Sequence, residues 1–203
     1  MRLFLTSSFI DVVSIFESFE NPEPGKKVAF IPTASLAEEI SFFVDEGKEV
    51  LEKLGLIVNE LEISTASEDE IKSKLTNSDY IYVAGGNTFF LLQELKKKNA
   101  DKIIVDQIVK GKLYIGESAG SIVAAPNIDY SKHMDDPKKA PELTNYDALN
   151  LVDFYTVPHY GCFPFEEETQ TIVDTYSSDL KLITIGNDQA ILVDHGNITI
   201  KKA

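Results

Sequence analysis

The chain has 203 residues, of which 43% are hydrophobic, and this size predicts a single α/β domain over residues 1–203. The 19 Lys and Arg residues are outnumbered by 33 Asp and Glu residues, and the net charge of −14 opposes binding to nucleic acid or to an anionic membrane. The only cysteine, Cys162, excludes an internal disulfide and a site built on several thiolates, which favours the reducing cytoplasm.

The first residues predict a strand and not a targeting segment. Residues 1–6 make a short apolar run, which lacks the length and the small-residue cleavage site of a signal peptide. No stretch of the chain approaches about 18 consecutive apolar residues, the length that a membrane-spanning helix needs. We therefore expect neither secretion nor insertion into a membrane.

Short β-branched and aromatic runs alternate with amphipathic segments in the first half of the chain. The runs predict strands, and the segments between them predict helices. Such alternation is typical of a parallel sheet that carries helices on both faces. The predicted strands cover residues 1–6, 28–32, 56–62, 79–84 and 112–116.

The clearest predicted helix covers residues 35–54, where apolar residues recur at helical spacing and predict a stripe that faces the core. Ser35 can cap its start, with Glu38 three residues later, and Gly55 can end it. The stripe consists of Leu36, Ile40, Phe43, Val44, Val50, Leu51 and Leu54.

Helical and strand periodicity both fail between residues 125 and 152, which predicts a long loop. Loops of this length inside a compact domain usually cover or build a functional site. Near the end of the chain, a turn at His195 joins two short strands and predicts a small antiparallel C-terminal extension, with that histidine at the surface. The elements expected after the loop are a strand at 154–158, a helix near 165–178, and strands at 181–185, 189–194 and 197–201.

Ser118 lies in a pattern typical of a nucleophile elbow, a sharp turn between a strand and a helix that exposes a catalytic side chain. Residues 116–120 read Gly-Glu-Ser-Ala-Gly, directly after the apolar run 113–115. The glycines allow a tight turn, and the N–H groups at the start of the helix can stabilise an anion. We therefore predict that Ser118 is a nucleophile; the alternative is a turn that exists only for packing.

A serine nucleophile needs a base, and the chain offers three histidines. His159 directly follows the predicted strand at 154–158, and ligands of open α/β sheets bind at the carboxyl ends of strands. Ser118 also follows a predicted strand, so both residues are expected at the same edge of the sheet, and we predict His159 as the base. His133, in the irregular loop, is the reserve candidate.

A second glycine turn, Gly85-Gly86, follows one predicted strand and precedes a predicted helix. Glycine lets a peptide N–H approach a substrate oxygen closely. We therefore predict that the backbone N–H groups of Gly86 and Ala119 form an oxyanion site, with Gly85 as an alternative donor. The other interpretation is a structural turn capped by Asn87 or Thr88.

The acid that orients the base has several candidates in the loop between serine and histidine, where the chain order is Ser, acid, His. These candidates are Asp129, Asp135, Asp136 and Glu142. Four further residues border the motifs and are expected to contact the substrate, although a salt bridge or a cap is the structural alternative for Glu117. They are Asn87, Thr88, Glu117 and Tyr160.

The motifs at 84–89, 116–121 and 158–159 together resemble those of the peptidase E family of serine peptidases, which includes the cyanophycinases. The resemblance covers nearly the whole chain, because the spacing of the three motifs and the order of strands and helices agree. It implies a three-layer, open and mostly parallel sheet, flavodoxin-like and related to the class I glutamine amidotransferases.

The resemblance also implies roles for single residues. Ser118 would be the nucleophile, His159 the base, and the glycine turn the oxyanion site. The family acid precedes a proline in the loop after the elbow, and Asp135 is the closest match if a short insertion is allowed. Asp136 and Asp129 are the alternatives for this acid.

One segment departs from the family pattern. Peptidase E is understood to recognise an N-terminal aspartate with arginines after the catalytic histidine, whereas residues 160–168 of this chain are acidic and apolar. Arg2 is the only arginine, so a bidentate partner for a substrate carboxylate is missing, and we expect aspartyl specificity to be lost or weakened. Residues 166–168, all glutamate, would attract a cationic amine or simply begin a helix.

We therefore predict a cytoplasmic serine peptidase that hydrolyses short peptides, as a monomer or a homodimer, without a metal or an organic cofactor. Two alternatives stay open. A small esterase would carry the same elbow, although the short chain and the missing His-Gly-Gly-Gly segment count against it. A ligand-binding or sensing protein would keep the fold and the serine without efficient catalysis.

Overall fold

The computed structural model describes residues 1–39 and 41–203. Its main sheet has seven strands in the order β3-β2-β4-β5-β1-β8-β9. The strands β1 to β5 pair in parallel, whereas β8 pairs antiparallel with β1, and β9 pairs antiparallel with β8. These strands are β1 (Arg2–Thr6), β2 (Lys27–Ile31), β3 (Ile57–Glu60), β4 (Tyr80–Val83), β5 (Leu113–Glu117), β8 (Gln189–Asp194) and β9 (Asn197–Lys202).

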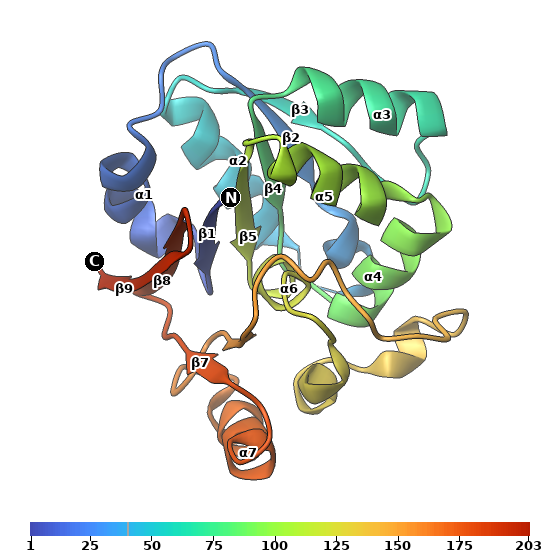
Figure 1. The fold of residues 1–203 in the computed structure, drawn as a ribbon, viewed down its shortest axis with the longest axis vertical. Coiled ribbons are helices and arrows are strands. Elements are labelled where there is room, and N and C mark those ends of the chain that lie inside the picture. The colour runs from blue at the N-terminus through green and yellow to red at the C-terminus, as the bar shows by residue number, and fades with distance from the viewer. Residues whose placement is uncertain (40) are drawn as a thin grey trace.

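Helices cover both faces of this sheet, as the alternating sequence pattern predicts (Figure 1). Side chains alternate between faces along a strand, so in β2 Val28 and Phe30 join one buried cluster while Ala29 and Ile31 join the other. The first cluster includes side chains of α1 and α2, and the second includes side chains of α3, α4 and α5. The helices are α1 (Val13–Glu20), α2 (Phe42–Lys53), α3 (Glu68–Asn77), α4 (Thr88–Lys97), α5 (Ala100–Val109), α6 (Ala119–Ile122) and α7 (Glu166–Tyr176).

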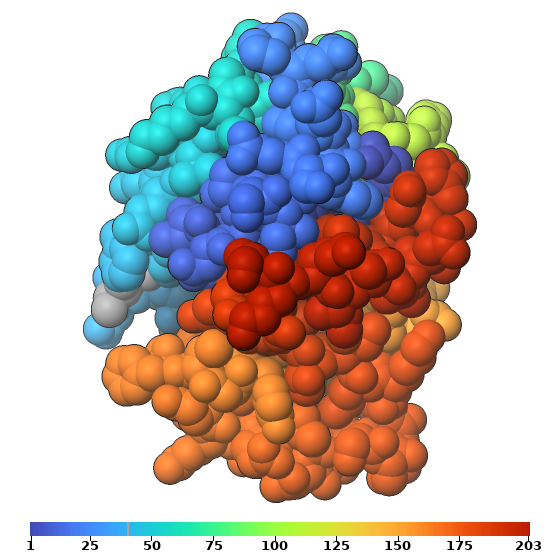
Figure 2. Space-filling view, turned by 90° about the vertical axis from the view of Figure 1, so that its left-hand side faces the viewer, coloured from blue at the N-terminus to red at the C-terminus, as the bar shows by residue number. Residues whose placement is uncertain are grey.

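A small β-α-β unit lies at one end of the main sheet (Figure 1). Strands β6 (Tyr155–Val157) and β7 (Leu182–Thr184) pair in parallel as a separate two-stranded sheet, and α7 connects them. Figure 2 shows β8 and β9 crossing the surface between the N-terminal segment and the region of α7. The strand that carries His159 at its end therefore belongs to this small unit and not to the main sheet.

The helix predicted over residues 35–54 is shorter than expected. Residues Thr33–Ala37 form a 3₁₀ turn, and α2 begins only at Phe42. Ser35 does not cap a helix, because its hydroxyl donates to the carbonyl of Pro32 at 2.8 Å, and Leu36 is 58% exposed. Ile40 of the predicted stripe lies outside the described residues.

Tertiary contacts explain this difference. The N–H of Asn87 donates to the carbonyl of Ala34 at 3.0 Å, and the Cα of Gly86 packs directly against the Ala34 backbone. The segment after β2 is therefore held by the glycine turn after β4, which overrides its local helical preference.

The predicted long loop after the elbow is present and contains two short 3₁₀ turns, Asp129–His133 and Pro137–Lys139. The turn at His195 is also as predicted, with a positive φ of 48° between the antiparallel strands β8 and β9.

Candidate active site

Ser118 lies at the junction of β5 and α6, in the strand, turn and helix arrangement that the sequence predicts. Its φ of 50° and ψ of −108° are unusual for a residue with a side chain, and such a conformation costs about 1–3 kcal/mol. The turn is held by the Ser118 N–H, which donates to Thr6 at 2.9 Å, and by the Ser118 carbonyl, which accepts from Ser121 and Ile122. The surrounding structure thus fixes the hydroxyl at the carboxyl end of the sheet.

His159 connects Ser118 to a third polar side chain. Its Nε2 lies 2.9 Å from Ser118 Oγ, and its Nδ1 lies 2.8 Å from Oδ1 of Asn187. Because an amide oxygen only accepts hydrogen bonds, Nδ1 carries the proton, and Nε2 is left as the acceptor for the serine hydroxyl. This is the tautomer that a general base for Ser118 requires.

Ser7 holds the backbone of His159. The Ser7 hydroxyl accepts from the His159 N–H at 2.9 Å and donates to the carbonyl of Ile185 at 3.1 Å. The imidazole also packs against the Phe165 ring, with 5.1 Å between the ring centroids. These contacts place the imidazole between Ser118 and Asn187.

The pKa of His159 lies below its usual value of 6.5, mainly because burial penalises the charged imidazolium, while the hydrogen bond to Asn187 acts in the opposite direction. His159 is therefore neutral at pH 7 and available as a base.

The two glycine turns meet beside Ser118. A Cβ at Gly85 would lie 3.2 Å from Ser118 Cβ, and Gly86 has a φ of +131°. Within the part of the chain that the structure describes, the N–H groups of Gly85, Gly86 and Ala119 have no hydrogen-bond partner. The turn at 85–86 and the start of α6 therefore offer free N–H groups near the serine.

Asp135, predicted to orient the base, does not contact His159 in the structure. Its Oδ2 accepts from the backbone N–H of Thr88 at 3.1 Å, at the start of α4. Burial raises the pKa of this carboxyl to about 6, partly offset by the Thr88 hydrogen bonds. Asn187 occupies the position next to Nδ1 that the prediction gave to an acid.

The other acids in the loop also bond elsewhere. Asp136 caps the 3₁₀ turn at Pro137–Lys139, Asp129 pairs with Lys132, and Glu142 pairs with Lys97. His133, the reserve base, is exposed and packs near the Tyr176 ring at 6.2 Å.

Glu117 is buried under the elbow, and each oxygen of its carboxylate accepts a hydrogen bond. Oε1 accepts from the Phe9 N–H and Oε2 accepts from the Tyr82 hydroxyl, both at 2.8 Å. Burial raises the pKa of Glu117 to about 7 despite these hydrogen bonds. These contacts favour the structural interpretation of Glu117 over contact with a substrate.

Three other residues predicted to contact the substrate have different surroundings. Asn87 caps α4 by accepting from the Phe90 N–H at 2.9 Å, and the Thr88 side chain is fully buried. Tyr160 lies outside the cavity above Ser118 and lines a separate open hollow of about 540 Å³ beside the first turn of α7. The side chain of Asn87 borders the cavity, but its oxygen is committed to the helix cap.

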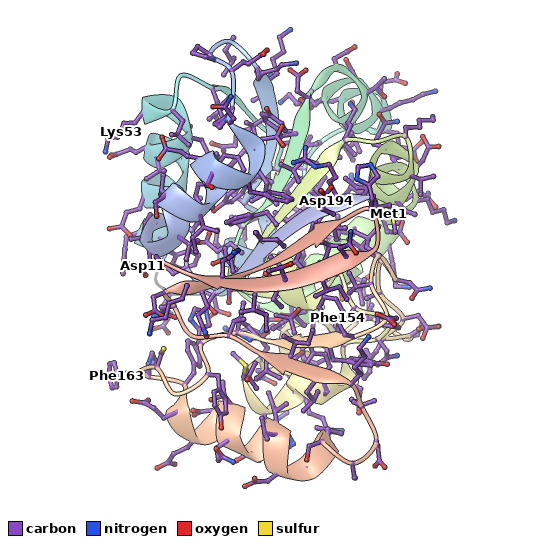
Figure 3. All side chains as sticks on the ribbon, turned by 60° about the vertical axis from the view of Figure 1, so that its left-hand side comes forward. Met1, Asp11, Lys53, Phe154, Phe163 and Asp194 are labelled. Carbon is purple, nitrogen blue, oxygen red and sulfur yellow. The ribbon has the colours of Figure 1, made fainter. Side chains whose placement is uncertain are left out.

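A cavity of about 780 Å³ opens above Ser118. It is bordered by the start of α2, the loop after α6 and the loop before α7, from which Phe163 projects with 86% exposure (Figure 3). The catalytic candidates Ser118, His159 and Asn187 all line it.

Comparison with known proteins decides the family. The sequence profile of peptidase family S51 matches residues 3–201. The chain belongs to peptidase family S51. It is therefore a serine peptidase, and the predicted family resemblance and fold class are confirmed.

Several relatives support this membership. An uncharacterized peptidase of Listeria innocua is 58% identical over 202 residues, which cover 100% of this chain and 97% of the relative. Peptidase E of Nostoc sp. is 33% identical over 135 residues, which cover 66% of this chain and 52% of the relative. The crystal structure of a protein from Listeria monocytogenes EGD-e, assigned to peptidase E, has a TM-score of 0.96, 55% identity and coverage of 100% and 98%.

A more distant structure supports the fold alone. The peptidase from an acI-B1 Actinobacterium has a TM-score of 0.73 at 19% identity, and the match covers 100% of this chain and 87% of that protein. Family membership favours the predicted peptidase over the esterase alternative.

Residues 1–39 and 41–203 contain neither a membrane-spanning helix nor a metal-binding cluster. None of their helices combines the length and apolarity needed to cross a membrane. No three or more of their His, Cys, Asp and Glu side chains are grouped so as to hold a metal ion.

Proposed function

We propose that this S51 peptidase cleaves short peptides through an acyl-enzyme on Ser118, with His159 as general base and Asn187 as the residue that orients it. The observation that carries this proposal is the continuous hydrogen-bonded chain Ser118–His159–Asn187, with distances of 2.9 and 2.8 Å. A neutral amide replaces the usual carboxylate, and it can still hold the imidazole in the reactive tautomer.

In the first step Ser118 Oγ bonds to the substrate carbonyl carbon while His159 Nε2 takes the hydroxyl proton. The negative charge on the carbonyl oxygen is stabilised by backbone N–H groups, for which Gly86 and Ala119 are the proposed donors and Gly85 the alternative. The C–N bond then breaks, and His159 gives its proton to the leaving amine. Water then gives a proton to His159 and attacks the ester carbonyl, the bond to Ser118 Oγ breaks, and Oγ takes the proton back as the second product leaves.

The proposed substrate is a short peptide without a requirement for an N-terminal aspartate. Arg2 is the only arginine, and it bonds Glu20 and Phe19 far from the cavity. A bidentate guanidinium partner for an aspartyl side chain is therefore missing among the residues that line the site. The cytoplasmic location and the monomer or homodimer stay predictions.

A library of di- and tripeptides, followed by mass spectrometry of the products, tests this function. We expect cleavage by the wild type and a loss of about 10³-fold or more in kcat/KM for Ser118→Ala. Hydrolysis that is undiminished in Ser118→Ala would contradict the assigned nucleophile. Stabilisation by a peptide without any cleavage would favour the ligand-binding alternative.

A further inference from the structure

Acidic side chains outnumber cationic ones in the wall of the cavity above Ser118. Six acidic side chains line it, against a single cationic side chain, Lys139, within the described lining; Glu117 is only partly ionised at pH 7, because burial raises its pKa to about 7. The acids come from the start of α2, from the segment before it, from the elbow and from the loop after α6. They are Glu38, Glu39, Glu46, Glu117, Asp135 and Asp136.

The one cation of the lining is already paired. Lys139 Nζ lies 3.0 Å from Oε1 of Glu38, and this contact joins the loop after α6 to the segment before α2. A substrate carboxylate entering the cavity would therefore have to compete with Glu38 for its only cationic partner. An anionic side chain is disfavoured at this site.

Several carboxylate oxygens remain available to a ligand. Across residues 1–39 and 41–203, no hydrogen bond or ion pair engages the side chains of Glu39 and Glu46. Asp135 is hydrogen-bonded through Oδ2 to the Thr88 N–H, and no cationic side chain of the described residues forms an ion pair with it. The cavity thus has negative charge that the protein itself does not neutralise.

Aromatic side chains lie among these acids. Phe42, Phe43, Phe163 and Phe165 line the same cavity, and Phe42 and Phe163 are 63% and 86% exposed. The Phe43 ring reaches the catalytic turn, because it lies 3.5 Å from the position of a Cβ at Gly85. Aromatic faces attract cations and also cover the methylene stem of a long cationic side chain.

These carboxylates share the cavity with the Ser118–His159 pair and with the free N–H groups of Gly86 and Ala119. The acids therefore line the same cavity as the proposed nucleophile and do not form an isolated acidic surface.

We propose that this peptidase selects peptides with a positive charge next to the scissile bond, either a free N-terminal ammonium group or a Lys or Arg side chain. This inference rests on the proposed function, because it assigns a substrate class to the same cavity. Glu39, Glu46 and Asp135 are the specificity-determining residues, and the phenylalanines supply the apolar contact.

Aminomethylcoumarin amides of Lys, norleucine and Asp, each with a free and an N-acetylated amine, test the inference. Norleucine is the uncharged match of Lys in length. We expect kcat/KM for a cationic compound to exceed that of its neutral match by about tenfold, and the advantage to shrink as salt screens it. If kcat/KM falls when the amine is acetylated, the recognised cation is the N-terminal ammonium group. If kcat/KM is lower for the norleucine compound than for the Lys compound, the recognised cation is the side chain.

The variant Glu39→Gln/Glu46→Gln should lower the cation-to-neutral ratio of kcat/KM severalfold. Glu49→Gln/Glu52→Gln is the matched control, because it removes the same two charges from exposed glutamates of α2 that do not line the cavity. The control should keep the wild-type ratio. Equal changes in both variants would show that only the net charge of the protein matters and would overturn the inference.

Labelling of Ser118 by a small fluorophosphonate in the same samples separates the claim about the substrate class from the claim that Ser118 is the nucleophile. If Ser118 is labelled but the cationic compounds show no advantage, or no compound is cleaved, the substrate class is wrong and the nucleophile stands. If Ser118 is not labelled and nothing is cleaved, the proposed function itself fails.

Discussion

Oδ1 of Asn187 lies 2.8 Å from Nδ1 of His159, where a carboxylate stands in the usual serine peptidase triad. An amide oxygen fixes the tautomer of the imidazole but provides less stabilisation of the imidazolium that forms during catalysis. The contact therefore assigns Asn187 a positioning role that depends on its oxygen.

Replacing Asn187 tests that role. Asn187→Ala removes the hydrogen bond, and we expect kcat/KM to fall about tenfold, with a smaller change in KM than in kcat. Asn187→Asp keeps an oxygen acceptor and should retain or raise the activity at neutral pH. Steady-state kinetics on the best peptide check both variants, and an inactive Asn187→Asp with an active Asn187→Ala would contradict the assignment.

The pH dependence follows from the lowered pKa of His159. The imidazole must be neutral to act as a base, so kcat/KM should rise with pH and reach half its maximum below pH 6.5. A carboxylate in Asn187→Asp favours the imidazolium and should shift this midpoint upward.

Asp135 needs a separate control, because burial raises the pKa of its carboxyl to about 6, within the same pH range. The variant Asp135→Asn removes that titration. If the acidic limb of the kcat/KM profile disappears in Asp135→Asn and is unmoved in Asn187→Asp, the assignment of the limb to His159 is wrong.

Glu117 should make the stability of the protein dependent on pH. Its pKa is raised from 4.5 to about 7 in the folded protein, so its contribution to stability is complete below pH 4.5 and is lost as the pH rises through about 7. At about 1.4 kcal/mol per pKa unit, the loss reaches up to about 3 kcal/mol.

The variant Glu117→Gln cannot titrate, yet its amide oxygen can still accept from Phe9. We expect urea unfolding at several pH values to show that the wild type loses stability relative to Glu117→Gln between about pH 4.5 and 7. A constant difference between the two proteins over this range would refute the raised pKa.

Gly86 is predicted to tolerate no side chain. A Cβ there would lie 2.3 Å from the Ala34 carbonyl atoms, so Gly86→Ala must displace the backbone of one of the two segments. We expect a loss of several kcal/mol in the free energy of unfolding and a loss of activity.

Gly111→Ala is the matched control for Gly86→Ala. Gly111 also has a positive φ, of +105°, but its added Cβ would meet nothing within 4 Å. It should cost only about 1–2 kcal/mol and leave kcat unchanged. Similar losses in both variants, measured by chemical denaturation, would show that backbone strain and not the contact with Ala34 determines the effect.

Much of the fold and two of the three residues of the Ser118–His159–Asn187 chain could be predicted from the sequence. Ser118 and His159 follow strands in recognisable local patterns, and local patterns are what a sequence displays. The 3₁₀ turn at Thr33–Ala37 could not be predicted in this way, because contacts with the glycine turn at 85–86, distant in sequence, determine it.

The prediction from sequence does not include Asn187, for a chemical reason. It requires an acid between Ser118 and His159, whereas Asn187 is neutral and follows His159. One signal in the sequence does point to Asn187. It comes shortly after the predicted strand at 181–185, and the carboxyl ends of strands are where ligands of α/β folds bind.

The role of Ser118 is tested most directly by the intact mass of the protein after treatment with a small fluorophosphonate, for the wild type, Ser118→Ala and His159→Ala. We expect one adduct on the wild type, none on Ser118→Ala, and strongly slowed labelling of His159→Ala, because the base activates the serine. Labelling of Ser118→Ala at the same rate as the wild type, or a wild type that is never labelled, would contradict the claim that Ser118 is the activated nucleophile.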